Sequence, residues 1–349
     1  METALLIVGG VMVAATLLPL CRYEAWWIRV FDFPRLQVSF VLVVVAAAQA
    51  ALGVEGIGEV LFLVALLASL ALQARRMYPY TRLAPQEVEQ SAGAKPESTL
   101  RLLFANVLQS NHQAERLKEI IREADPDIIL ALETDAWWQG QLEEFTRSHP
   151  QHVLQAQDNT YGMLLYSRLP LHDAHVDFLV EDGVPSIHAQ VRLRSGQPVQ
   201  LHCMHPRPPS PTENDRSTER DAEMLIVGRQ IARNPGPVIV LGDLNDVAWS
   251  HTNDLFKQIS GLLDPRVGRG FFNTFNAKHR LIRFPLDHFF HSNDFRLVAF
   301  RRLGFFGSDH FPVFIELSFE PQAEVTQPEP EAGAAEQREA SEKIAEATH

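Results

Sequence analysis

The sequence predicts an α/β domain that follows about three transmembrane helices. Two observations support this assignment. Three long apolar stretches without basic residues occupy most of the first 74 residues, and short strand-like runs alternate with helical and turn segments from Leu100 to Phe319. A third observation concerns function, because several strand-like runs end in an acid, an amide or an imidazole. With 349 residues, 46% of them hydrophobic, the chain can form one large domain and something smaller.

The three apolar runs predict transmembrane helices at residues 4–20, 36–54 and 57–74, within a membrane region at 1–76. Each is close to the roughly 17–25 residues that cross a bilayer. A signal peptide would place a single run behind basic residues, whereas this chain begins Met-Glu-Thr and has three. Buried helices of a soluble domain are the alternative, but little sequence is left to cover them. Gly53 and Gly56 predict a tight turn that makes the second and third helices a hairpin.

Arginines flank these helices at one end only. They are Arg22, Arg29 and Arg35 between the first two runs, and Arg75, Arg76 and Arg82 after the third. Because basic residues favour the cytoplasmic side, this distribution predicts a multi-pass cell-membrane protein with everything after residue 75 in the cytoplasm. If the third run does not cross, or if Trp26, Trp27 and Phe31 mark an interfacial helix, the large domain lies outside instead.

The rest of the chain divides into three predicted parts. Residues 77–98 are polar and contain Gly93 and Pro96, which is typical of a linker, and residues 99–319 form the α/β domain. Residues 320–349 are rich in Ala, Glu, Gln and Pro and are predicted to be a disordered acidic tail. The tail holds eight acids and two basic residues, so half of the net charge of -12 belongs to it. Neither part is basic enough for a general nucleic-acid binder, and two cysteines predict no disulfide framework.

Polar residues at strand ends predict the functional site. The buried run Val238 to Leu241 leads into Gly242, Asp243 and Asn245, and the wholly apolar run Ile128 to Leu132 ends at Glu133. Carboxylate and amide oxygens of this kind bind Mg²⁺, with Mn²⁺ as an alternative. Glu133 is the favoured metal carboxylate, whereas Asn106, which also follows a strand, is by itself more typical of a turn.

An acid–base group is predicted near the other end of the domain. Asp309 and His310 stand directly before the apolar run that begins at Phe311, so His310 is presented at the start of a buried strand. Asp287, at the start of another strand, is a carboxylate that could orient the His310 imidazole.

Seven motifs in order carry a family resemblance: Asn106, Leu132-Glu133-Thr134, Tyr161-Gly162, His205, Gly242 to Asn245, Leu286 to Phe289, and Gly307 to Val313. They resemble those of the endonuclease/exonuclease/phosphatase superfamily over about residues 100–318. The resemblance implies a four-layer, DNase I-like α/β sandwich. It also implies magnesium-dependent cleavage of a phosphoester or phosphoanhydride bond by a hydrolase.

The resemblance also implies roles for individual residues. Glu133 and Asn106 would hold the metal, with Asp309 supporting either the metal or His310. Asp243 would orient or deprotonate the attacking water. Three further side chains would contact the phosphate: Asn245, His205 and His310, the last paired with Asp287. Tyr161 is a substrate-binding candidate by the same resemblance.

Two residues near His205, His202 and Arg207, each have two possible interpretations. His202 competes with His205 for the same role, but strand alternation points the two side chains to opposite faces, and the loop position favours His205. Arg207 could clamp a phosphate, or it could be a solvated loop arginine.

A membrane anchor would hold the site near lipid headgroups, which favours a phospholipid or a lipid-linked pyrophosphate as substrate and the bilayer as partner. Three spans followed by this domain also resemble membrane phosphatases associated with glycopeptide resistance, which act on lipid-carrier pyrophosphates outside the membrane. One alternative is a membrane-tethered nuclease that uses the basic cluster Arg266, Arg269, Lys278, His279, Arg280 and Arg283. The other is a non-catalytic membrane scaffold. No protein partner can be inferred.

Overall fold

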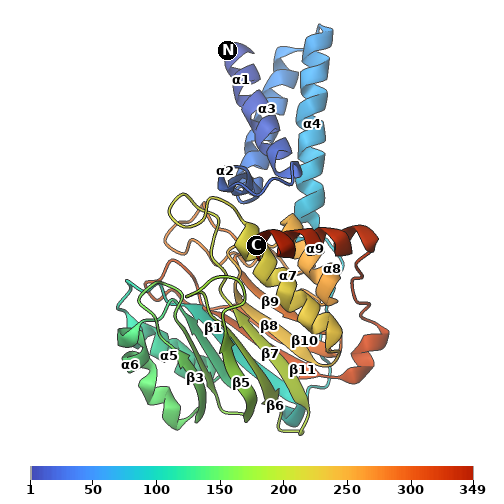
Figure 1. Ribbon diagram of the computed structural model, residues 1–349. Helices are drawn as coiled ribbons and strands as arrows, with labels where there is room; N and C mark the ends of the chain where they lie inside the picture. Colours follow the sequence, from blue (N-terminus) through green and yellow to red (C-terminus); the bar gives the residue numbers. More distant parts are fainter. Residues whose placement is uncertain (1, 349) are drawn as a thin grey trace.

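The computed structural model describes residues 2–348 and places three long helices at one end of a pair of stacked sheets (Figure 1). The helices are α1 (Glu2–Leu17), α3 (Arg35–Leu52) and α4 (Ile57–Met77). All three are long and apolar enough to cross a membrane, which confirms the expected apolar helices. Gly53 ends α3 with a φ of 100°, a conformation that favours glycine, and the chain turns there into α4 as predicted.

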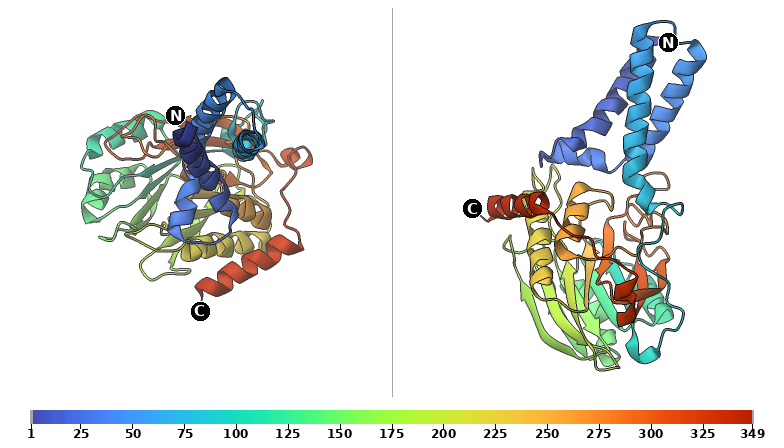
Figure 2. Two further views of the ribbon diagram at one scale, coloured as in Figure 1. Left: turned by 90° about the horizontal axis from the view of Figure 1, so that it is seen from above. Right: turned by 90° about the vertical axis from the view of Figure 1, so that its right-hand side faces the viewer.

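The segment between α1 and α3 forms short helical pieces at the base of the helices: η1 (Leu18–Leu20), α2 (Trp26–Arg29) and η2 (Val30–Asp32). Figure 2 shows this base lying against the sheet domain. After α4, the short helices η3 (Tyr78–Tyr80) and η4 (Pro96–Ser98) lead into the domain.

Two sheets form the centre of the domain. The first has six strands in the order β10-β11-β1-β2-β4-β3, and the second has five in the order β5-β6-β7-β8-β9. Strands of the first sheet are β1 (Thr99–Asn106), β2 (Ile128–Leu132), β3 (Gln151–Gln155), β4 (Met163–Ser167), β10 (Phe295–Arg302) and β11 (Val313–Phe319). Those of the second are β5 (Leu171–Asp177), β6 (Ser186–Arg192), β7 (Pro198–Met204), β8 (Val238–Asp243) and β9 (Asp287–His291).

Helices cover the outer face of each sheet. α5 (Ala114–Ala124), α6 (Ala136–Leu142) and η5 (Glu143–Arg147) pack on the first sheet, and α7 (Thr218–Arg233) and α8 (His251–Ser260) pack on the second. The inner faces of the two sheets share one core, in which Phe104 of β1 meets Phe289 of β9. The four layers confirm the expected α/β sandwich, because each sheet buries one face on its partner and the other on helices.

The predicted linker at 77–98 is not a free segment. Val88 is fully buried in the core between the sheets, and Gln90 bridges to Leu297 of the edge strand β10. Backbone hydrogen bonds join Leu297 N to Glu89 O and Ser91 N to Leu297 O. This part of the linker is ordered because it pairs with backbone groups that β10 would otherwise leave unpaired at the sheet edge.

The expectation of a disordered tail at 320–349 is wrong. The chain forms η6 (Pro321–Val325) and α9 (Ala334–Ala347), and Figure 2 shows α9 lying across the domain. Ala340 and Ile344 of α9 pack on Leu225 of α7 and on α8. The Lys343 ammonium also forms ion pairs with Glu24 and Asp221. A narrow apolar stripe and one partly buried, ion-paired lysine order a segment whose mean composition resembles that of a disordered one.

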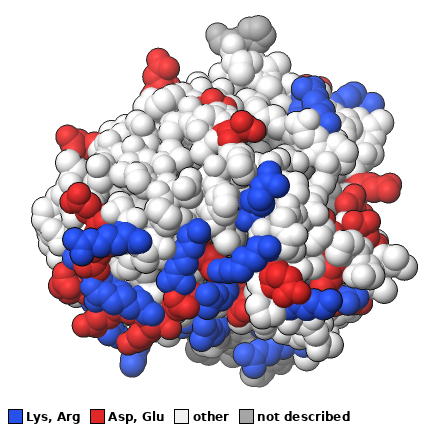
Figure 3. All heavy atoms as spheres, turned by 90° about the horizontal axis from the view of Figure 1, so that it is seen from below, with Lys and Arg blue, Asp and Glu red and all other residues white. Residues whose placement is uncertain are grey.

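The face of the domain remote from the N-terminal helices carries both signs of charge. Figure 3 shows Lys and Arg interspersed with Asp and Glu there, without a continuous basic surface.

Candidate active site

The strand ends that the sequence singled out meet at the end of the sandwich nearest the N-terminal helices. Asn106 ends β1 and Glu133 follows β2 in one sheet, while Asp243 ends β8 and Asp287 begins β9 in the other. His310 stands three residues before β11. In the first sheet β1 is parallel to β2 and antiparallel to β11, and in the second β8 is parallel to β7 and antiparallel to β9. These pairings bring side chains that are far apart in the chain to one edge.

Two glycines allow the backbone to approach closely at this edge. A Cβ on Gly242 would lie 1.9 Å from Met204 O, and Gly242 has a φ of 149°. A Cβ on Gly162 would lie 1.8 Å from Thr134 O, beside Glu133. No side chain fits at either position, so the Tyr161-Gly162 and Gly242-Asp243 motifs have a steric basis.

Asn106 links the two sheets through its side-chain amide. Nδ2 donates to Glu133 Oε1 at 2.7 Å and to Asp243 Oδ2 at 3.1 Å, while Oδ1 accepts from Leu108 N at 3.0 Å. The bond from Leu108 N fixes which end of the amide is the oxygen. In this arrangement Asn106 is a donor between two carboxylates, and its oxygen is already in use.

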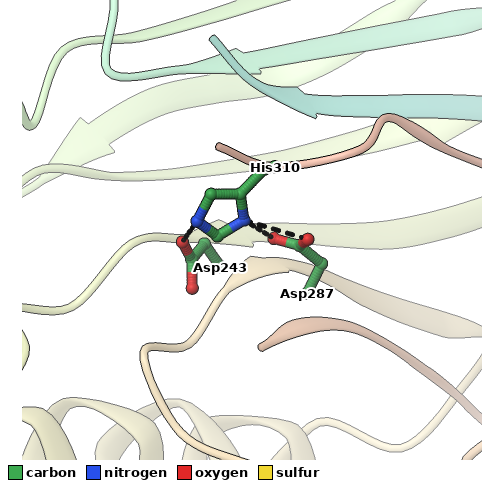
Figure 4. Close-up of side chains that lie close together, drawn as sticks. All are labelled: Asp243, Asp287 and His310. Carbon is green, nitrogen blue, oxygen red and sulfur yellow. Dashed lines mark hydrogen bonds and ion pairs between the residues drawn. The ribbon is translucent and has the colours of Figure 1, made fainter. Parts of the chain in front are cut away.

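His310 lies between two carboxylates, as Figure 4 shows. Nδ1 is 3.1 Å from both oxygens of Asp287, and Nε2 is 3.4 Å from Asp243 Oδ2. Burial would lower the pKa of His310, but Asp287 and Asp243 outweigh it and raise the pKa to about 10. The ring is therefore an imidazolium at neutral pH, with both nitrogens donating.

The site has two groups that resemble metal ligand sets, and they differ chemically. Ligand atoms of Asp243, Asp287 and His310 lie within 4.8 Å of one another. An imidazolium has no lone pair for a metal, so His310 already supplies the positive charge in that group. Glu133 differs, because its one side-chain hydrogen bond among the described residues comes from Asn106.

The chemistry around Glu133 fits a hard cation. Burial raises the pKa of Glu133 to about 7, the hydrogen bond from Asn106 and the charge of His310 oppose this, and the charges of Asp243 and Asp309 add to it. A carboxylate in a partly dehydrated, acidic setting lacks a cationic partner of its own, and a divalent ion would supply one. Asp309 is half-buried and near enough to raise the pKa of both Glu133 and His310.

His205 and Asn245 complete the site on the side of the second sheet. His205 is buried, and burial lowers its pKa to about 4, so its imidazole is neutral. Asn245 N donates to Asp243 Oδ1 at 2.9 Å, and its Nδ2 donates to Pro206 O at 3.0 Å. His202 lies on the other face of its strand, with Nδ1 2.7 Å from Nδ1 of His188, so it is not part of the site.

The two predicted substrate-binding residues lie together beside His205. The Tyr161 ring is 5.3 Å from the His205 ring, and its hydroxyl donates to Glu213 Oε2 at 3.0 Å. The Arg207 guanidinium lies 5.4 Å from the centre of the Tyr161 ring and 3.4 Å from Glu181 Oε1. Arg207 is thus ion-paired through Nε with Glu181, and no ion pair of its terminal Nη atoms is present among the described residues.

Sequence reasoning missed the residues that hold the site in place. Two buried arginines donate to backbone carbonyls of candidate site residues: Arg220 Nη1 to Asn245 O at 2.8 Å and Arg266 Nη1 to Asp287 O at 3.1 Å. Ser308 Oγ donates to Asn106 O at 2.8 Å and accepts from His310 N at 3.0 Å. Ser308 belongs to the Gly307-to-Val313 motif, so the sequence offered a signal for it. No local sequence pattern distinguishes a buried arginine that supports a site from a solvated one.

The loops that carry the site also contact the base of the N-terminal helices. Trp249 Nε1 donates to Asp32 O at 2.7 Å, and Ala248 O accepts from Tyr80 Oη at 2.6 Å. Ala248 and Trp249 lie in the loop after β8. Trp26 N donates to Asp215 O at 2.9 Å in the loop after β7. The edge that carries the candidate site therefore faces the helices rather than the remote end of the domain.

Two helix-flanked sheets with an acid-bracketed histidine at one edge define a DNase I-like hydrolase fold. The chain belongs to the Endonuclease/Exonuclease/phosphatase family, whose model matches residues 100–310, and it is a hydrolase that acts on phosphoester bonds. No curated protein sequence matches the chain.

Solved structures share the fold at low identity. TDP2 of D. rerio in complex with a single-strand DNA product is 18% identical, with a TM-score of 0.53 over 63% of this chain and 99% of the other. An endonuclease/exonuclease/phosphatase from Bacteroides vulgatus is 16% identical, with a TM-score of 0.53 over 64% and 100%. The human Nocturnin catalytic domain is 15% identical, with a TM-score of 0.52 over 65% and 96%.

Proposed function

We propose that this chain is a membrane-anchored, Mg²⁺-dependent phosphoesterase that hydrolyses a phosphoester or phosphoanhydride bond of a phospholipid or a lipid-linked pyrophosphate. The observation that supports this proposal is the orientation of the site. Its loops contact the base of three helices that are long and apolar enough to cross a bilayer. A site held next to the base of these helices would lie close to the bilayer surface and reach lipid headgroups without extracting a lipid from the membrane.

In the proposed mechanism Asp243 accepts a proton from the water that attacks phosphorus. Burial raises the pKa of Asp243, which makes the carboxylate a stronger base, and the His310 charge opposes that shift. Asn245 N holds one Asp243 oxygen at 2.9 Å and so fixes the direction of the other. Glu133, with Asp309 near it, would hold Mg²⁺, and Asn106 would orient the Glu133 carboxylate through its Nδ2 hydrogen bond. A bound ion would neutralise charge on the phosphate oxygens.

His310 stabilises the charge that develops on the phosphate. As an imidazolium held by Asp287 at 3.1 Å, it donates from Nε2 to a phosphate oxygen in place of its contact with Asp243. The neutral His205 would donate a second hydrogen bond. Asn245 Nδ2, which donates one hydrogen to Pro206 O, would donate its other hydrogen as a third. Asp287 holds the His310 ring in place before the substrate arrives, which lowers the cost of reorganisation in the transition state.

The nuclease alternative depends on the basic cluster at 266–283, and the structure divides that cluster. Arg266 is buried in the core and paired with Asp264 at 2.7 Å. Arg269, Arg280 and Arg283 instead line a groove against α3. A basic surface that faces apolar helices supports a lipid substrate better than a nucleic acid.

The test is phosphate release by the detergent-solubilised chain, with Mg²⁺ or EDTA, from a panel of phospholipids and lipid pyrophosphates, with plasmid DNA in parallel. Mg²⁺-dependent release from a lipid, lost in Glu133→Ala and kept in Glu123→Ala, is expected. Glu123 is a matched control because it is exposed and forms no ion pair among the described residues. Nicked plasmid with intact lipids would identify a tethered nuclease, and no hydrolysis of any substrate would favour a scaffold.

A further inference from the structure

An open groove of about 1000 Å³ lies where α3 meets the loop between α8 and β9. Leu36, Phe40 and Val41 of α3 form one apolar wall, and Phe271, Phe272 and Leu281 form another. Phe40 is 70% exposed and Leu281 is 87% exposed, so the apolar lining is accessible. Gln37 Nε2 donates to Leu281 O at 2.8 Å and ties the loop tip to the helix.

Five arginines share this groove with the apolar side chains: Arg82, Arg269, Arg280, Arg283 and Arg302. Within residues 2–348, none of the five has a carboxylate within 4.0 Å, although arginines elsewhere in the fold, such as Arg220 and Arg296, are ion-paired. Burial and the neighbouring charge of Arg283 both lower the pKa of Arg302. Uncompensated cations this close together repel one another, and an anion bound among them would remove the repulsion.

The arginines are held in place by groups other than acids. Arg302 Nη1 donates to Asn273 O at 2.7 Å, and the Arg302 and Arg283 guanidinium groups lie 4.5 Å and 5.0 Å from the centre of the Phe311 ring. Arg280 forms no hydrogen bond or ion pair with a described residue, and its side chain is exposed. The groove thus presents two oriented guanidinium groups and one free one, all able to donate to phosphate oxygens.

A short path connects the groove to the catalytic edge. Phe311, between the two arginines, is the neighbour of His310 in the chain, and the Phe275 ring lies 4.9 Å from the His310 ring. Ala277 N donates to Asp309 O at 2.6 Å, and Arg283 Nη2 donates to Ala277 O at 3.4 Å. The same loop therefore lines the groove at one end and supports the site at the other.

We propose that this groove binds a phosphate-bearing membrane lipid, with the phosphate on Arg280, Arg283 and Arg302 and the hydrocarbon chain along Phe40 and Leu36 of α3. The inference rests on the proposed function, which it deepens by naming where the substrate enters. A lipid is the occupant because charge and apolar surface occur side by side. α3 is itself one of the candidate membrane spans, so a lipid can reach the groove sideways from the bilayer.

The test measures binding of fluorescent phosphatidic acid to the full-length chain in nonionic detergent micelles with EDTA present, so that no hydrolysis is needed. Arg280→Gln is the clean variant because Arg280 supports no other described residue. The Kd of the Arg280→Gln variant for phosphatidic acid is expected to rise at least about tenfold, because the variant loses one charge-assisted hydrogen bond. Phe40→Ala is expected to raise Kd as well, whereas phosphatidylcholine and glycerol phosphate are expected to bind weakly.

Arg301→Gln is the matched control. Arg301 is the exposed neighbour of Arg302, and its guanidinium lies 4.6 Å from the centre of the Phe314 ring. Because Arg301 does not line the groove, the Kd of the Arg301→Gln variant for phosphatidic acid is expected to match that of the wild type. Equal binding by Arg280→Gln, or equal competition by glycerol phosphate, would overturn the groove assignment even if lipid hydrolysis occurs. Arginine-dependent binding without Mg²⁺-dependent hydrolysis of any lipid would support the groove and reject the proposed function.

Discussion

Asn106 Nδ2 donates a hydrogen bond to Asp243 Oδ2 at 3.1 Å, and this bond joins the end of β1 in one sheet to the end of β8 in the other. The same nitrogen donates to Glu133, so one buried amide spaces two carboxylates that would otherwise repel each other. The bond makes the geometry of the site depend on how the two sheets pack.

Asn106→Ala removes this spacer while leaving both carboxylates in place. We expect kcat/KM to fall about 100-fold, the typical loss when one oriented hydrogen-bonding group is deleted from an active site. Steady-state kinetics on the substrate found by the lipid panel would measure the loss. Asn293→Ala, whose side chain makes no hydrogen bond to a described residue, is the control. An Asn106→Ala enzyme with wild-type kcat/KM would show that the bridge is only structural.

The affinity for Mg²⁺ is expected to depend on pH through Glu133. With its pKa near 7, Glu133 is largely protonated below pH 7, and a protonated carboxyl competes poorly for a cation. The Mg²⁺ concentration for half-maximal activity should therefore rise as pH falls, by about tenfold per unit below pH 7. Mg²⁺ titrations of activity at several pH values between 5.5 and 8.5, roughly bracketing that pKa, test this. A half-maximal concentration independent of pH would contradict the assignment of Glu133.

Asp287 is expected to keep His310 charged. A histidine donates as an imidazolium only below its pKa, and the pKa of about 10 keeps His310 charged through the neutral range. Asp287→Asn removes the nearer carboxylate, so the pKa of His310 falls and the alkaline limb of the kcat/KM profile moves to lower pH. Asp158→Asn, at an exposed position, provides the control profile. An unshifted limb in Asp287→Asn would assign that limb to another group.

Cys21 can report the side of the membrane on which the domain lies. It is exposed at the base of the helices, whereas Cys203 is buried. The arginine distribution predicts a cytoplasmic domain, so a membrane-impermeant maleimide should label Cys21 in sealed right-side-out vesicles only after permeabilisation. Cys21→Ser should remain unlabelled in both states. Labelling of sealed vesicles would place the domain outside, as the resemblance to lipid-carrier phosphatases implies.

Local patterns in the sequence located the three apolar helices and the polar strand ends that meet in the candidate site. The apolar runs gave α1, α3 and α4, and the polar strand ends selected Asn106, Glu133, Asp243 and His310. Strand alternation also separated His205 from His202, because side chains three apart on a strand point to opposite faces.

Amino-acid composition did not predict the structure of segments that are held by a few specific tertiary contacts. The tail is ordered because Ala340, Ile344 and Lys343 find partners on α7 and in the segment before α2, which no property of residues 320–349 reveals. The basic cluster divides for a similar reason, since Arg266 is paired with Asp264 inside the core, whereas Arg280 lines the groove and has no ion pair within residues 2–348. Both outcomes depend on neighbours that are distant in the chain.

The sequence by itself determined which residues can do the chemistry, since hydrophobic period and residue type are properties of short segments. Only the tertiary structure decided which of these residues meet, that the site faces the base of the apolar helices, and that several arginines line a groove beside α3. The physical reason is that a contact across 137 positions, such as Asn106 with Asp243, is set by the packing of two sheets on a shared core. No local preference encodes that packing.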